Sequence, residues 1–114
     1  MITIWHNPRC SKSRQTLTLI EAAGVPVSIR RYLEDAPTAA EIAQVRDVLG
    51  LASVREMMRG GESVFKELKL GPDTPETALI AAMAAHPILI ERPIVIAGGR
   101  AVIGRPPEAV KTLL

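Results

Sequence analysis

The chain has 114 residues, of which 47% are hydrophobic and 23% are charged. This size and composition fit one globular domain over residues 1–114 and exclude a disordered chain. The net charge of +2 and the aromatic content of 3% argue against a nucleic-acid-binding surface. No apolar run approaches the roughly 18 residues of a membrane span. The segment Met1–Trp5 is followed too soon by a charge and a proline for a signal peptide. We expect a cytoplasmic protein that acts as a monomer.

The first thirty residues predict a strand, a helix and a second strand. Residues 2–5 alternate as a short strand does, and Asn7-Pro8 ends it. Residues 11–23 read as a helix with Leu17, Ile20 and Ala23 on one stripe, and residues 25–31 as the next strand. Such a unit places its two strands in parallel with a right-handed crossover.

The middle of the chain is predicted to be helical. Thr38 and Glu41 have capping-box spacing before a helix that ends at Gly50. Ser53 and Glu56 form a second box before a short helix that Gly60-Gly61 stops, and a third helix opens at Thr74-Pro75 and ends before Pro87.

The last third of the chain is predicted to contain strands rather than helices at first. Residues 94–97 and 100–103 are two β-type runs around Gly98-Gly99, which predicts a hairpin, and residues 106–114 predict a closing helix. The whole predicts an α/β sandwich: βαβ, a helical insert, then ββα, with a mixed sheet of about four strands.

Cys10 is the single cysteine and lies where the first strand meets the first helix. Free N–H groups and the helix dipole favour a thiolate there. His6, Arg9, Lys12 and Ser13 add polar groups nearby. A reactive thiol is one interpretation, and a buried, inert cysteine is the other. A lone cysteine excludes an internal disulfide, and with only two histidines no metal site is expected.

Two familiar thiol motifs are excluded by single residues. A C-x-x-C pair would need cysteine at position 13, which is Ser13. A phosphatase loop of the form C-x5-R would need arginine at position 16, which is Thr16. A second thiol for redox chemistry must therefore come from another molecule.

The hairpin suggests an anion site. If Ala97 faces Arg100, paired residue numbers sum to 197, and the same register brings Arg92 opposite Arg105. Two guanidiniums so placed repel each other unless an anion lies between them. Two solvent-facing arginines at frayed strand ends are the alternative. Arg59 is expected at the end of the short helix. Its positive charge would either stabilise the C-terminus of that helix or provide a third contact to the anion.

At this point the chain resembles the glutaredoxin-coupled arsenate reductases of the thioredoxin-like superfamily, over essentially its whole length. The segments that carry the resemblance are His6–Arg14, Arg31–Glu34, Arg59–Glu62, His86–Val95 and Gly104–Glu108.

The resemblance implies a thioredoxin-like fold and the reduction of arsenate to arsenite through a covalent cysteine–arsenate intermediate. It implies glutathione as co-substrate, glutaredoxin as partner and no bound cofactor. Cys10 matches the nucleophile, and His6 and Ser13 match groups that tune it. The oxyanion ligands are matched by Arg59, Arg92 and Arg105, and Pro93 matches a cis proline.

Two alternatives remain. The first is a glutathione-dependent thiol oxidoreductase without an arsenate role. The second is a regulatory binding module of the same fold, although Ser13 stands where such a module usually carries its second cysteine.

Overall fold

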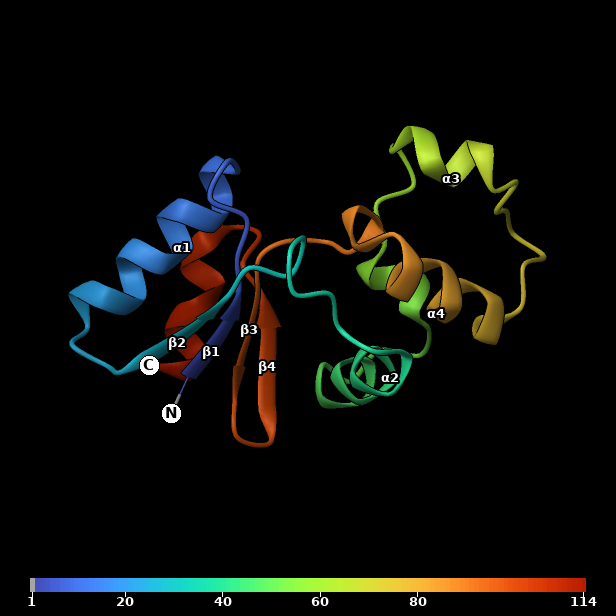
Figure 1. The fold of residues 1–114 in the computed structure, drawn as a ribbon. Helices are drawn as coiled ribbons and strands as arrows, with labels where there is room; N and C mark the ends of the chain where they lie inside the picture. Colours follow the sequence, from blue (N-terminus) through green and yellow to red (C-terminus); the bar gives the residue numbers. More distant parts are fainter. Residues whose placement is uncertain (1) are drawn as a thin grey trace. The chain divides into compact units, whose positions relative to one another are not determined.

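The computed structural model describes residues 2–114. Met1, the first residue of the segment considered above as a signal peptide, lies outside the described residues. The elements in chain order are β1(Ile2–Trp5), α1(Ser11–Ala22), β2(Val27–Arg30), α2(Ala39–Val48), η1(Val54–Met57), α3(Ser63–Glu67), α4(Glu76–Ala85), η2(Pro87–Leu89), β3(Ile94–Ala97), β4(Arg100–Ile103) and η3(Pro107–Leu113), where η marks a 3₁₀ helix. They form two compact units (Figure 1). Unit 1 comprises the residues up to Asp35 together with Arg92–Leu114, and unit 2 comprises Ala36–Glu91.

Unit 1 is built on a four-stranded mixed sheet with the order β2-β1-β3-β4. β1 and β2 are parallel, with α1 between them in the chain, whereas β1–β3 and β3–β4 are antiparallel. The predicted βαβ unit and the hairpin are therefore confirmed, and so is its register, because Ala97 pairs with Arg100.

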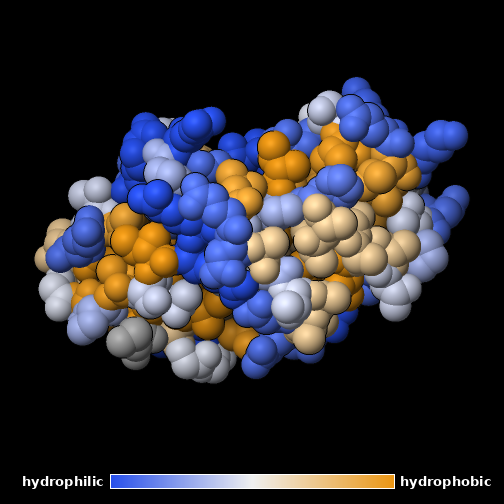
Figure 2. All heavy atoms as spheres, viewed as in Figure 1, coloured by the Kyte–Doolittle hydropathy of each residue, from blue (hydrophilic) through white to orange (hydrophobic). Residues whose placement is uncertain are grey.

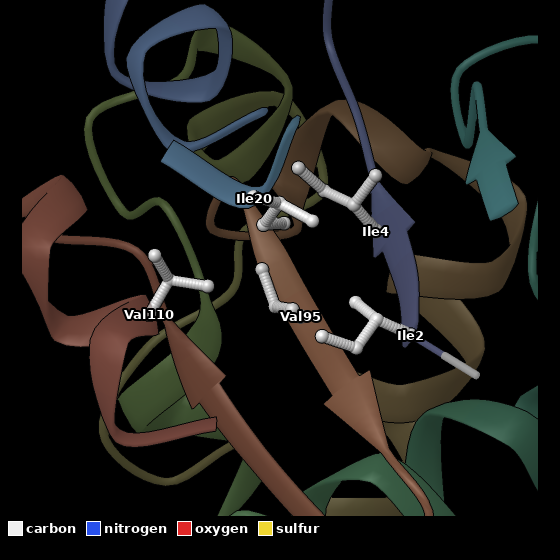
Figure 3. Close-up of a cluster of buried hydrophobic side chains, with 5 residues drawn as sticks. All are labelled: Ile2, Ile4, Ile20, Val95 and Val110. Carbon is white, nitrogen blue, oxygen red and sulfur yellow. The ribbon is translucent and has the colours of Figure 1, made fainter. Parts of the chain in front are cut away.

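One face of this sheet carries the core of unit 1. α1 and η3 pack together there, and Ile2 and Ile4 of β1 meet Ile20, Val95 and Val110 (Figure 3). The predicted stripe on α1 is correct only in part, because Ile20 is buried but Ala23 is exposed. The helix instead turns two hydroxyl residues inward, Ser13 and Thr16.

Unit 2 contains the helical insert, and both predicted capping boxes are formed, at Thr38 and at Ser53. A carboxylate joins three of its elements. Glu76, in the first turn of α4, accepts hydrogen bonds from Ser53 Oγ at 2.7 Å, Val54 N at 2.9 Å and Arg46 Nη1 at 3.0 Å. α2 and η1 are thereby tied to the start of α4.

Several boundaries differ from the prediction. α3 was not expected, and it buries none of its five residues, so it has no apolar stripe to reveal it. η2 was also not expected, because its three residues are too few to show a period. The closing helix is 3₁₀ and begins at Pro107. In the part of the chain that is described, no helix has the length and apolar character needed to cross a membrane.

Candidate active site

Four chain segments leave or enter the sheet of unit 1 at one edge. Trp5, the last residue of β1, pairs with Arg30 at the end of β2 and with Ile94 at the start of β3. Ile94 in turn pairs with Ile103 at the end of β4. His6, Arg31, Pro93 and Gly104 therefore flank the sheet at this same edge. Figure 2 shows hydrophilic side chains covering the end of unit 1 at which α1 begins.

The β3–β4 register continues beyond the strands. Gly104 N donates to Pro93 O at 2.9 Å, and Arg105 Nε donates to Arg92 O at 2.9 Å. The two arginines expected to face each other are thus brought together. The Arg92–Pro93 bond is cis, as the resemblance implies, and so is Arg105–Pro106, which was not expected.

The two arginines differ in exposure. Arg105 is exposed, whereas Arg92 is half-buried with its Nε and Nη1 atoms shielded from solvent. The Arg105 side chain reaches the backbone carbonyl of Arg92, so the two residues are neighbours, and guanidiniums on neighbouring residues can bind an anion together. This geometry is consistent with the predicted anion clamp.

A close contact ties these arginines to α1. A Cβ added to Gly104 would lie 2.6 Å from Thr16 Oγ1 and 2.7 Å from Pro93 Cγ. Thr16 is fully buried and lies six residues after Cys10, or about 9 Å along a helix axis. Only glycine lets the segment that carries Arg105 approach α1 this closely. The contact between Gly104 and Thr16 was not predicted, because no local pattern marks a contact between distant segments.

Cys10 is the N-cap residue of α1, with extended backbone angles (φ −94°, ψ 124°). Its N–H donates to Asn7 O and its carbonyl accepts from Arg14 N, both at 3.0 Å. The first turn of α1 contains no acidic residue to offset the positive end of the helix dipole. The residue is buried, with 8% of its surface exposed.

Ser13 joins the loop before Cys10 to the helix after it. Its Oγ lies 2.6 Å from His6 Nδ1 and accepts the Asn7 N–H at 3.0 Å. Within residues 2–114, both hydrogen bonds found for Ser13 go to this loop rather than to the sulfur. Arg14 adds a further tie, since Nη1 donates to Pro8 O at 3.0 Å. Ser13 was predicted to lie at this site, but Asn7, whose Oδ1 accepts the Arg9 N–H, was not.

His6 is the first residue of the loop between β1 and α1, and it is buried. Burial is the main cause that lowers the pKa of His6 below 6.5, and the positive charges of Arg31 and Arg14 lower it further. The imidazole is therefore neutral at pH 7. A neutral ring with its proton on Nε2 accepts the Ser13 hydroxyl hydrogen at Nδ1.

Arg59 belongs to unit 2 and does not end a helix as predicted. η1 stops at Met57, and Met58 forms a β-bridge with Ile90. Arg59 N donates to Leu89 O at 2.8 Å, which holds the residue in this extended segment. Its guanidinium is ion-paired with Glu62 and lies 4.0 Å from a Glu91 carboxylate oxygen.

These two carboxylates were not predicted, although Glu62 lies only three residues after Arg59. Across residues 2–114, no group of three or more His, Cys, Asp or Glu is placed to hold a metal ion.

Comparisons with known proteins agree with this architecture. Residues 5–113 match the model of the ArsC family. An arsenate reductase of Neisseria meningitidis is 46% identical over 114 residues, covering 99% of this chain and 97% of the relative. The uncharacterized protein YfgD of Escherichia coli is 50% identical, covering 96% and 92%. The structure of an arsenate reductase from Vibrio cholerae superposes with a TM-score of 0.96 at 49% identity, covering 99% and 97%. The chain belongs to the ArsC family.

Proposed function

We propose that this protein is an arsenate reductase that converts arsenate to arsenite with Cys10 as the nucleophile. One observation carries the proposal: the sheet register brings the loop of Cys10 to the same edge as Arg92 and Arg105. The arsenate reductases among its relatives support the choice of substrate. We further propose that the two units act as one domain, in a cytoplasmic monomer.

Substrate binding is assigned to three guanidiniums. Arg92 and Arg105 hold arsenate oxygens through charge-assisted hydrogen bonds. Arg59 supplies the third contact, for which it must exchange or share the carboxylates that it binds in this structure. Neutralising the anion lowers its repulsion of an incoming thiolate and fixes the arsenic for attack.

Cys10 then forms a covalent bond to arsenic. The thiolate attacks, an oxygen leaves as water after protonation, and arsenic stays pentavalent. Glutathione replaces a second oxygen as water. The two sulfurs then join in a mixed disulfide: of the two electron pairs in the As–S bonds, one forms the S–S bond and the other stays on arsenic, which becomes trivalent. The arsenic product, HAsO2, takes up one of the two released waters to give arsenous acid. In sum, protein thiol, glutathione and arsenic acid give the mixed disulfide, arsenous acid and one water.

His6 and Ser13 are assigned to positioning the nucleophile. They tie the loop to α1 through the 2.6 Å contact, and the neutral imidazole adds no charge that would compete for arsenate. Because the chain contains one cysteine, an external thiol must regenerate Cys10. Glutaredoxin is proposed for that step, and no bound cofactor is required.

The test is NADPH oxidation in the presence of glutathione, glutaredoxin and glutathione reductase, with and without arsenate. We expect arsenate-dependent turnover that Cys10→Ser abolishes. Arg92→Ala and Arg105→Ala raise the KM for arsenate or lower kcat, whereas Arg100→Ala, at the opposite end of β4, serves as the matched arginine control. Retained turnover in Cys10→Ser rejects the assignment. Arsenate-independent reduction of mixed disulfides alone points to a general thiol oxidoreductase.

A further inference from the structure

A small pocket of unit 1 lies beside the Cys10 loop. Its volume is about 250 Å³, and the residues that define its chemistry are His6, Arg9, Arg31, Leu33 and Glu34. One wall is the loop between β1 and α1, and the other is the turn that follows β2. Because β1 and β2 end side by side, both walls rise from the sheet edge that carries Cys10.

Backbone contacts hold the two walls together. His6 N donates to Arg30 O at 2.8 Å, and Glu34 N donates to Arg31 O at 3.0 Å within the turn. Tyr32 is 1% exposed and anchors this turn in the protein. Its neighbours Arg31 and Leu33 are exposed. The pocket is therefore built on hydrogen-bonded backbone, and its three charged residues, Arg9, Arg31 and Glu34, are exposed.

The pocket contains more positive than negative side chains. Arg9 and Arg31 are cationic, Glu34 is anionic, and His6 is neutral at pH 7 because burial and Arg31 lower its pKa. The pocket thus offers two guanidiniums and one carboxylate, with a net charge of +1. A complementary ligand carries two carboxylates and one ammonium group.

We propose that this pocket is the glutathione site, an inference that rests on the function proposed above. Glutathione has two carboxylates and one ammonium group at pH 7. Arg9 and Arg31 bind the carboxylates, Glu34 binds the ammonium group, and the exposed Leu33 packs against the peptide. Arg9 lines the pocket and directly precedes Cys10 in the chain, so the pocket adjoins the segment that carries the nucleophile.

A second cavity near Cys10 fits the same ligand less well. It has a volume of about 500 Å³ and includes Ser11, Arg14 and Glu108 among its lining residues. It offers one cation and one carboxylate, so one glutathione carboxylate would have no partner. In addition, Arg14 already donates to Pro8 O.

Steady-state kinetics with chosen thiols test the assignment. We expect Arg9→Ala and Glu34→Gln each to raise the KM for glutathione roughly three- to tenfold, as for exposed or half-exposed ion pairs. The KM for arsenate and kcat at saturating glutathione stay unchanged. N-acetylglutathione, which lacks the ammonium group, has a raised KM with the unmodified protein, and Glu34→Gln adds no further increase. The Arg9→Ala effect persists with that analogue.

Glu108→Gln in the second cavity is the matched carboxylate control and leaves the KM for glutathione unchanged. If Glu108→Gln raises that KM and Glu34→Gln does not, the assignment is overturned. Arg31 is omitted from the kinetic variants because its charge also acts on His6.

Binding separates this proposal from the proposed function. S-methylglutathione, which cannot react, is titrated into the Cys10→Ser variant and followed by amide NMR shifts. Saturable shifts over residues 31–34 support the pocket, even if the protein reduces no arsenate. If arsenate is reduced but those amides do not move, the pocket assignment is wrong while the proposed function stands.

Discussion

Replacing Gly104 with alanine tests how unit 1 joins its arginine pair to α1. The new methyl group would lie 2.6 Å from Thr16 Oγ1, 2.7 Å from Pro93 Cγ and 3.2 Å from Thr16 Cγ2. Neither neighbour moves easily, because Thr16 is fully buried with its hydroxyl donating to Lys12 O at 2.8 Å, and Pro93 is a buried ring. The strain is steric, since Gly104 does not adopt a left-handed backbone.

Overpacking of this kind costs about 1–3 kcal/mol of the free energy of unfolding. For a chain of this size, that loss lowers Tm by roughly 4–15 °C. The same displacement moves Arg105 relative to Cys10, so we expect kcat/KM for arsenate to fall by at least about tenfold, as happens when catalytic groups are misplaced by an ångström.

Urea unfolding followed by circular dichroism, together with the coupled NADPH assay, measures both effects. Gly99→Ala is the matched control, because its Cβ would meet nothing within 4 Å and the backbone is not left-handed. Its free energy of unfolding should change by less than about 0.5 kcal/mol. In the Gly104→Ala/Thr16→Ala double variant, two of the three close contacts disappear, so the two substitutions should cost less together than the sum of each alone. A Gly104→Ala protein as stable and active as the original would refute the reasoning.

Three further results are expected. Glu76→Gln should lower the free energy of unfolding by roughly 1–2 kcal/mol in urea titrations, since Glu76 accepts three hydrogen bonds. The hydrogen bond from the Ser53 hydroxyl is the main cause that lowers the pKa of Glu76. The contribution of the Glu76 carboxylate to the free energy of unfolding is therefore present above pH 4.5 and lost as pH falls through the folded pKa. A free energy of unfolding that falls equally with pH in Glu76→Gln and in the unmodified protein would contradict this. An NMR titration of His6 should give a pKa below 6.5, so the free energy of unfolding should fall as pH drops from 6.5 through the folded pKa, because the unfolded state takes up the proton first; a value above 6.5 would be inconsistent with its burial. Glu62→Gln should lower the KM for arsenate roughly two- to fivefold, because Arg59 loses a competing carboxylate; a raised KM would mean that Glu62 positions Arg59 instead.

Local patterns were enough to predict most of the fold. Capping boxes at Thr38 and Ser53 and the Gly98-Gly99 turn are short-range signals, and each appears in the structure. α3 and η2 were missed because they have few residues and little buried apolar surface. Arg59 was placed at a helix end because Gly60-Gly61 looked like a helix stop, whereas the chain had already left η1 to pair with Ile90.

The same distinction between local signals and contacts of distant segments applies to the candidate site. The hairpin register predicted that Arg92 and Arg105 face each other, since that relation follows from residue numbers alone. The contact of Gly104 with Thr16 joins a loop to a distant helix, and no sequence period reports it. The Glu91 carboxylate near Arg59 likewise depends on the bridge between Met58 and Ile90.

The covalent role of Cys10 is tested most directly by the intact mass of the protein after a single turnover. The protein is mixed with arsenate and glutathione, without glutaredoxin, and quenched in acid. The proposed mechanism predicts one glutathione joined to Cys10 by a disulfide, formed only when arsenate is present and in step with arsenite release. Arsenite released from a protein whose Cys10 stays unmodified, or the same adduct formed equally without arsenate, would contradict it.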